Sequence, residues 1–370
     1  MRLSESTERA LEACQDAVLA PELWPAALQR LSDSFGASST VLLPVDSPTT
    51  RAPISTEHFE FDALWHRNQS HAPCVFTRKA PCKLGLPYVI EQQIVSPEER
   101  KREPYFHETA RVGDRDWWAE VCFPVAGKQW CLALYRSAEL GPFTHEDGRY
   151  LALAGSPLSR IVSSAERFAQ RQVSSTLSAL EQLNSPALVI DWRGMVRGVN
   201  SHAEALLCDD FRLVAGRPTA SDRESNRRLQ DLIAAVRNAE RGGVPDYNQV
   251  VINREYRPWL LVEAMPVTSF GSDMFGDGRA VLLLTDLTVP LVTDQTLLAV
   301  VFGLTAAEAK MAARIAQGSG IDEAAAALHI SRETARSQLK AVFLKTSTRR
   351  QAELAAVLNR LRPFSARTSG

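Results

Sequence analysis

The alternation of apolar and polar positions divides the chain into segments of helical and strand periodicity. Apolar residues at helical spacing predict a helix over 8–31. A short run of residues that favour β-strands predicts a strand over 38–43. The Ser-Pro-Glu-Glu run at 96–99 has the features of a helix start, with a Ser cap, Pro in the first turn and acidic residues near the positive helix end. We therefore expect a mixed α-helix and β-sheet unit over 1–155.

Two apolar runs flank a glycine-containing turn and predict a β-hairpin. With the turn centred on residues 127–128, Val125 would face Trp130, and Cys122 and Cys131 would be diagonal neighbours. Diagonal neighbours are about 7–8 Å apart, beyond the usual reach of a disulfide. We therefore expect both cysteines to be small core residues. Both faces of the hairpin are apolar, which predicts a sheet covered on both sides.

A long helical stretch follows Thr144, is interrupted at Gly155-Ser156-Pro157 and continues to Leu183. Its later part carries apolar residues three and four positions apart. This seam fits an ordinary amphipathic helix packed on its own domain, and it fits a two-helix dimer seam equally well. The sequence leaves both interpretations open.

The pattern changes again after the long helix. The expected order is strand–turn–strand at 186–200, helices near 201–208 and 222–240, and strands near 247–253, 258–267 and 280–286. Ile190-Asp191-x-x-Gly194 with Asn200 resembles the opening of a PAS domain, and Leu284-Thr-Asp286 resembles its last strand. The resemblance implies a PAS-like α/β module over 185–287.

Four helices are predicted in residues 303–362. Thr305 and Glu308 form a capping box at the start of the first helix, and Gly318 ends it. Ser331 caps the third helix. Residues at i, i+4, i+7 and i+8 of that helix form one apolar face: Ala335, Leu339, Val342 and Phe343.

The opposite face of the third helix presents Glu333, Arg336, Ser337 and Lys340, a surface of short and cationic side chains. An α-helix fits the major groove of DNA, where Arg and Lys donate hydrogen bonds to guanine. We therefore expect this face of the third helix to enter the major groove. Flanking residues suited to phosphate contacts, which position a protein without reading sequence, are Ser331, Arg332, Thr334 and Lys345.

These positions resemble the LuxR-type helix-turn-helix module. The resemblance is carried by Leu304-Thr305-x-x-Glu308, Gly318, Glu323-Ala-Ala, Leu328-x-Ile330-Ser331-x-x-Thr334-x-Arg336 and Lys345. It implies DNA binding as a dimer through the third helix, with Arg336, Ser337 and Lys340 at the groove-facing positions. The sequence departs from the family pattern at Ala324 (usually Ile), at His329 (usually a turn Gly) and at Lys345-Thr-Ser-Thr (usually Lys-Leu-Gly-Val). These departures leave the turn geometry and the dimer contacts open.

The first unit resembles a GAF domain or the acyl-homoserine-lactone-binding domain of LuxR regulators, both α-β-α sensor folds. Trp65 and Ala72-Pro73 occupy part of the lactone-binding pattern, but the Asp that would hold the lactone amide is missing. Aromatic residues are concentrated in this unit. They predict a small-molecule pocket lined partly by Trp65, Trp117 and Trp118, with an ordinary aromatic core as the alternative.

Charge separates along the chain although the net charge is only −1. Residues 303–370 hold 11 Lys or Arg and 5 Asp or Glu, a net charge of +6, so the preceding 302 residues carry −7. This asymmetry indicates a nucleic-acid-binding end on an acidic body, or a solvated basic tail. The chain has six cysteines, no secretory signal and no apolar run of about 18 residues. We expect a reduced, cytoplasmic protein without a membrane span.

The motifs of several chemistries are absent. There is no Gly-x-x-x-x-Gly-Lys-Ser/Thr phosphate loop and no Ser-His-Asp or nucleophile-elbow pattern. His66, His71, Cys74 and Cys82 form the only metal-like cluster, and their spacing matches no standard zinc site. We therefore expect no catalytic residues, no metal and no cofactor.

The resulting expectation is a multidomain α+β regulator with an all-α end. Its segments are a GAF-like sensor (1–155), a connecting helix (156–184), a PAS-like domain (185–287), a linker (288–302), a LuxR-type module (303–362) and a disordered tail (363–370). The linker ends in an apolar run that is expected to dock through Leu297, Val300 and Phe302. The expected partners are double-stranded DNA, a second copy of the chain and a small molecule. The alternatives are a protein-interaction sensor with a degenerate helix-turn-helix, and an enzyme localised by that module.

Overall fold

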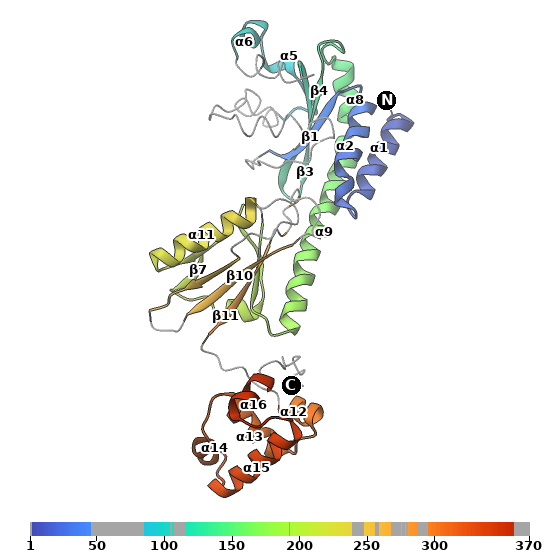
Figure 1. The fold of residues 1–370 in the computed structure, drawn as a ribbon. Helices are drawn as coiled ribbons and strands as arrows, with labels where there is room; N and C mark the ends of the chain where they lie inside the picture. The colour runs from blue at the N-terminus through green and yellow to red at the C-terminus, as the bar shows by residue number, and fades with distance from the viewer. Residues whose placement is uncertain are drawn as a thin grey trace. The chain divides into compact units, whose positions relative to one another are not determined.

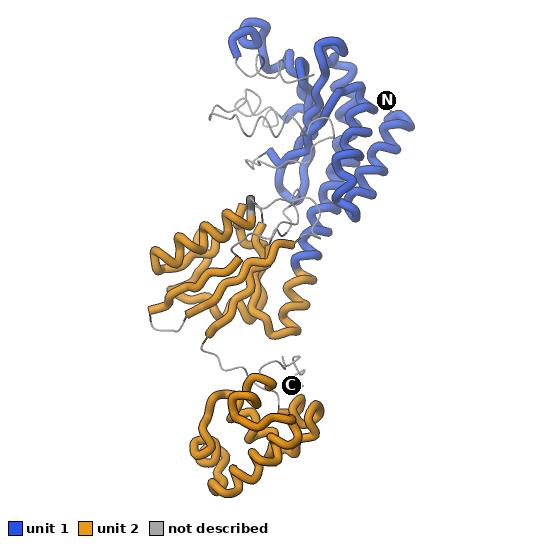
Figure 2. The backbone as a smooth tube through the Cα atoms, viewed as in Figure 1, with its two compact units in different colours: residues 1–173, 268–278 blue, residues 174–267, 279–370 orange. Residues whose placement is uncertain are grey.

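A computed structural model of the chain describes its fold as two compact units. The described residues are 2–45, 85–103, 106, 115–191, 193–238, 248–255, 259–267, 275, 278, 280–287 and 295–358. One unit comprises 1–173 and 268–278, and the other comprises 174–267 and 279–370 (Figure 2). The chain therefore passes between the units three times.

The first unit is built on a four-stranded antiparallel sheet of order β1-β4-β3-β2. Its strands are β1 (Ser39–Pro44), β2 (Val89–Ile90), β3 (Trp117–Val125) and β4 (Lys128–Arg136). The helices are α1 (Glu5–Asp16), η1 (Pro21–Leu23), α2 (Trp24–Ser34), α5 (Glu91–Ile94), α6 (Pro97–Arg102), α8 (His145–Ala152) and α9 (Gly155–Gln182). Helices α1, α2 and α8 and the start of α9 gather on one side of the sheet, over a continuous apolar core (Figure 1).

The long helix α9 buries its apolar seam within its own chain. Leu158, Ile161, Val162, Ala165 and Ala169 all belong to the main core of the first unit. Of the two interpretations that the sequence left open, the structure favours the ordinary amphipathic helix. These five side chains are not available for a dimer seam.

The β3–β4 hairpin has a different register from the one expected. Val125 pairs with Lys128 and Phe123 with Trp130, because the turn consists of Ala126 and Gly127, both with positive φ (46° and 79°). Two-residue turns of this kind match the twist of a hairpin. Cys122 is therefore directly opposite Cys131 rather than diagonal to it. Cys131 is a buried free thiol, as expected, whereas Cys122 is disulfide-bonded, which corrects the expectation for that residue.

The second unit contains a five-stranded antiparallel sheet. Its strands are β5 (Ala187–Ile190), β6 (Val196–Val199), β9 (Gln249–Ile252), β10 (Leu260–Pro266) and β11 (Ala280–Asp286), in the order β6-β5-β11-β10-β9. If the five strands are numbered by their order along the chain, their order across the sheet is second, first, fifth, fourth, third. Between β6 and β9 lie α10 (Ser201–Glu204), the hairpin β7 (Phe211–Val214) and β8 (Arg217–Ala220), and α11 (Arg223–Asn238). The sequence did not predict this hairpin, whose turn has Ala215 and Gly216 at positive φ.

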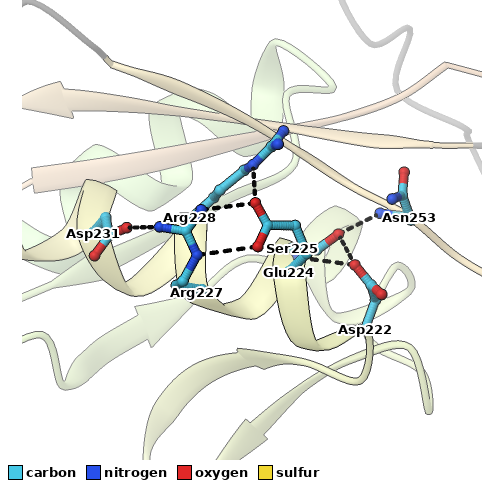
Figure 3. Close-up of polar contacts among 7 residues, drawn as sticks. All are labelled: Asp222, Glu224, Ser225, Arg227, Arg228, Asp231 and Asn253. Carbon is cyan, nitrogen blue, oxygen red and sulfur yellow. Dashed lines mark hydrogen bonds and ion pairs between the residues drawn. The ribbon is translucent and has the colours of Figure 1, made fainter.

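Polar contacts fix the start of α11 against the end of β9 (Figure 3). A carboxylate oxygen of Asp222 accepts hydrogen bonds from the Ser225 amide (2.8 Å) and hydroxyl (2.6 Å). The Ser225 hydroxyl in turn accepts one from the Asn253 amide (3.0 Å). Glu224 pairs with Arg227 and Arg228 on the exposed side, and hydrogen bonds from these two residues lower the pKa of Glu224 to about 2.

The C-terminal end is all-helical. Its helices are α12 (Gln295–Phe302), α13 (Ala306–Ala316), α14 (Ile321–Ala327), α15 (Arg332–Lys345) and α16 (Gln351–Leu358). They share one apolar core, to which α12 contributes the fully buried Leu298. Residues 295–302, expected to belong to a linker, thus form a helix packed into this core. Residues 363–370, expected to be a tail, lie outside the described part of the chain.

In the described ranges, no single helix is long and apolar enough to cross a membrane. Helices α12 and α13 together are long and apolar enough to cross a membrane, but a bend of 113° separates them.

Candidate functional site

Helix α15 is held at its start by a side-chain cap. The Ser331 hydroxyl accepts a hydrogen bond from the Thr334 amide (3.1 Å) and lies 2.9 Å from the Thr334 hydroxyl oxygen. Ala335, Leu339 and Val342 are buried in the module core, as their spacing predicted, with Phe343 packed partly against it. One face of α15 is therefore fixed by packing, which leaves the opposite face to solvent.

The exposed face of α15 carries the residues that the sequence assigned to the major groove. Arg336, Ser337 and Lys340 are all exposed and lie within about one turn of the helix. Leu344, four residues after Lys340, lies on the same face with 83% of its surface exposed. The exposure of Leu344 was not predicted, because a leucine near the end of an amphipathic helix is expected in the core.

The four residues expected to contact phosphate all make contacts within the module. Ser331 and Thr334 form the cap described above. Arg332 pairs with Asp322 of α14 at 2.6 Å, with both side chains mostly exposed. The Lys345 ammonium donates to the Gly303 carbonyl (3.0 Å) and to Glu308 (2.7 Å), and its hydrogen bond lowers the pKa of Glu308. Contacts to a phosphate would therefore have to share these groups with their present partners.

The turn before α15 is a Schellman motif with a histidine in the left-handed position. His329 has φ of 54°, its amide donates to the Ala326 carbonyl, and the Ile330 amide donates to the Ala325 carbonyl. The turn geometry that the His329 departure left open is thus the one that a glycine there would adopt. The angle between α14 and α15 is set by this turn and by the shared core.

A second candidate site lies on the first sheet, on the face away from α1 and α2. Successive strand residues point to opposite faces, so Trp118 and Glu120 of β3 share this face with Cys131, Ala133 and Tyr135 of β4. We call it the polar face. Of the five buried charged residues in the described part of the chain, three lie on it or at its edge: Glu91, Arg115 and Glu120.

Glu91 lies at the β2 edge of the polar face, 3% exposed and paired with Arg100 of α6. The Arg100 guanidinium is 4.5 Å from the ring centroid of Phe106 and 4.2 Å from that of Trp117. Its other terminal nitrogen donates to the Asp116 carbonyl. Burial raises the pKa of Glu91 to about 7, and the Arg100 charge opposes this shift.

Glu120 lies in the middle of the same face. Burial raises the pKa of this carboxyl to about 8, and a hydrogen bond involving the Cys131 thiol opposes the shift. The guanidinium of Arg115 lies 5.4 Å from the ring centroid of Tyr135. Burying three charged side chains on one sheet face is costly unless they are paired, so this interior is not an ordinary apolar core.

The three tryptophans predicted to line a pocket are placed differently from one another. Trp118 is buried on the polar face among Val89, Val95 and Phe106. Trp117, its neighbour in β3, points to the opposite face and packs partly against the main core. Trp65 lies outside the described residues, as do His66, His71, Cys74 and Cys82. The described residues contain no group of three or more potential metal ligands.

Comparison with known proteins gives only distant likenesses. No family model and no curated protein matches the chain. Among solved structures, it is similar to the ligand-binding domain of VqsR from Pseudomonas aeruginosa, with 14% identity and a TM-score of 0.29 over 45% of this chain and 99% of that one. It is also similar to an N-acylhomoserine-lactone-dependent LuxR-family transcription factor from Burkholderia cenocepacia, with 15% identity and a TM-score of 0.27 over 44% of this chain and 95% of that one. A third similar structure is a phage VqmA–DPO complex, with 15% identity and a TM-score of 0.24 over 52% of this chain and 90% of that one. These scores are too low to establish a shared fold.

Proposed function

We propose that the protein is a DNA-binding transcriptional regulator of the LuxR type. In this proposal α15 reads DNA sequence, and the N-terminal body senses a small molecule or another signal. The observation that carries the proposal is the two-sided character of α15. Its apolar side is packed into a helical core, and its exposed side presents Arg336, Ser337 and Lys340, with Glu333 as the one acidic residue in the first turn of the helix.

The geometry supports groove reading because the side chains are presented from a rigid rod. A bidentate contact from Arg or Lys to guanine discriminates by about 1–3 kcal/mol against the wrong base. Such discrimination requires a fixed helix, and the Ser331 cap with the Schellman turn at His329 supplies it. The +6 charge of residues 303–370 adds the sequence-independent attraction to phosphates.

The body fits a sensory role in two respects. The strand order second, first, fifth, fourth, third in residues 187–286 is the order of a PAS-like sheet, and the layered first unit is consistent with a GAF-like sensor. The charged interior of the polar face is compatible with a ligand site. We infer that Trp118 contacts the ligand and that Trp117 acts indirectly, by packing against Arg100.

The experiment that tests the function is selection of binding sites from a random duplex library with the full chain. Enrichment of one motif, repeated as two half-sites, is the expected outcome. A library without enrichment would support a degenerate helix-turn-helix or a localised enzyme instead. The selected duplex then serves as the probe for the variants discussed below.

A further inference from the structure

We propose that the polar face binds a small aromatic molecule through an N–H-bearing head group that donates a hydrogen bond to Glu91. This inference deepens the sensory part of the proposed function and rests on it only for its biological meaning. The binding itself is a property of the first unit and can be tested without DNA.

The first step is an account of the hydrogen bonds of Glu91. Its Oε1 accepts from the Arg100 guanidinium, whereas its Oε2 is buried and has no hydrogen-bond partner. An ionised carboxylate can accept several hydrogen bonds, and leaving a buried charged acceptor unsatisfied is unfavourable. A donor brought by a ligand would satisfy Oε2 without displacing Arg100.

The second step concerns the sign of the ligand's head group. Arg100 is paired with Glu91, and its two terminal nitrogens already donate to Glu91 and to the Asp116 carbonyl. Its guanidinium carbon also lies over the aromatic rings of Phe106 and Trp117. The group left without a partner is therefore an acceptor. A ligand carboxylate or phosphate would place another acceptor beside it, so the head group must donate.

The third step concerns the body of the ligand. Trp118 and Phe106 belong to one apolar cluster on the polar face, with Tyr135 partly buried against it. Phe106 is also next to Arg100, the partner of Glu91. Aromatic side chains favour planar aromatic partners in offset or edge-to-face arrangements. An aromatic ring with an amide, amidine or amine substituent combines both requirements. Burial raises the pKa of Glu91 to about 7, so its carboxylate is mainly an acceptor only above that pH, and the probes are compared at about pH 8.5.

The experiment uses three probes that share one ring and differ in the head group: benzamidine, benzamide and benzoate. Binding to the full-length protein is measured by tryptophan fluorescence and by the shift in unfolding temperature. We expect saturable binding of benzamidine and benzamide at millimolar concentration and none of benzoate. Benzoate binding as well as the other two, or no saturable binding of any probe, would overturn the inference; this comparison needs no variant.

A matched pair of variants locates the site. Glu91→Gln keeps the shape of the side chain and removes the carboxylate, and should weaken benzamidine binding by about 10–100-fold, the value of a hydrogen bond to a charged group. Glu98→Gln makes the same change at an exposed position of α6 and should leave binding unchanged. Equal affinity of the Glu91→Gln variant and the wild type would place the probe elsewhere.

DNA binding of the same preparations separates this inference from the proposed function. If the selected duplex binds but no probe does, the regulator stands and the ligand class is wrong. If the probes bind through Glu91 but no DNA sequence is selected, the site stands and the protein is not a DNA-reading regulator.

Discussion

Three residues in the left-handed backbone region end the helices of the C-terminal module. Gly318 (φ 91°), His329 (φ 54°) and Ser347 (φ 55°) follow α13, α14 and α15 in turn. Two of them, His329 and Ser347, stand where the LuxR-type pattern has glycine. A non-glycine residue in this region costs roughly 1–2 kcal/mol, so the module retains these turns at an energetic cost.

This cost predicts opposite effects of two substitutions. His329→Gly should stabilise the module by about 1 kcal/mol, since the turn relaxes without losing a described contact. Gly318→Ala should destabilise it by a similar amount through the backbone alone, because no atom lies within 4 Å of the added Cβ position. Hydrogen exchange of the α13–α15 amides in the full chain measures both changes. If both substitutions stabilised the module, or both destabilised it, the explanation by backbone conformation would be contradicted.

Glu120 predicts a pH dependence of stability. Its folded pKa of about 8 exceeds the ordinary value of 4.5, so the folded state binds the proton more tightly. The stability that the protonated form contributes is present below pH 4.5 and is lost as pH rises through about 8. Glu120→Gln stays neutral, and relative to wild type it should gain stability across this window, on the order of a few kcal/mol.

Unfolding temperatures of wild type and variant, measured at several pH values, test this difference. Glu139→Gln, at an exposed position of the first unit, is the control and should show no such trend. A constant difference between wild type and Glu120→Gln over the whole window would mean that Glu120 is ionised in the folded protein throughout.

At the scale of elements, the sequence predicted well where periodicity alone decides the outcome. The buried and exposed faces of α15, its Ser331 cap and the capping box at Thr305 follow from spacing within one helix, and the structure confirms each of them. The two hairpin turns were less predictable. Ala126 and Ala215 both adopt positive φ, which alanine rarely does. The β3–β4 register was therefore two residues off, and the β7–β8 hairpin was not seen.

Helix α12 gives a prediction at the same scale. Leu298 is fully buried in the module core, whereas Val300 is 77% exposed. Leu298→Ala should destabilise the module by about 2–5 kcal/mol, as truncation of a buried leucine does. Val300→Ala should change stability by less than about 0.5 kcal/mol. Denaturant unfolding of the full chain, followed through the C-terminal helices by hydrogen exchange, compares the two.

The Val300→Ala variant also tests the docking role expected of the apolar run. A stable variant with altered DNA binding would show that exposed Val300 has a partner outside the module. An unchanged variant would leave the run with a purely structural role through Leu298.

At the scale of the whole molecule, long-range contacts are what the sequence could not supply. Phe275, carried between β10 and β11, is buried in the first unit, with its ring centroid 5.1 Å from Trp24 and 5.6 Å from Trp130. No local pattern links these three residues. Glu91 and Arg100 are only nine residues apart, but their pairing depends on the turn between α5 and α6, which no periodicity predicts. The polar face was thus beyond prediction, although its aromatic residues were noted.

The proposed homodimer is a prediction at this scale. Two modules reading two half-sites bind more tightly than one. The first part of the α9 seam, from Leu158 to Ala169, cannot supply the contact because it is buried in the core of the first unit. We expect sedimentation of a dimer at micromolar concentration and a ratio of two chains per selected duplex. A monomer that occupies a single half-site would rule out the dimeric reader.

The central claim is that the exposed face of α15 reads DNA sequence. Its most direct test is the affinity of the full chain for the selected duplex, and for a scrambled duplex, in wild type, Arg336→Ala and the control Arg314→Ala, which removes an exposed arginine of α13. We predict that Arg336→Ala weakens specific binding by about 1–3 kcal/mol and relaxes the preference at one base position. Arg314→Ala should change both duplexes alike and only slightly. Equal losses for the two variants, with the sequence preference intact, would contradict the claim.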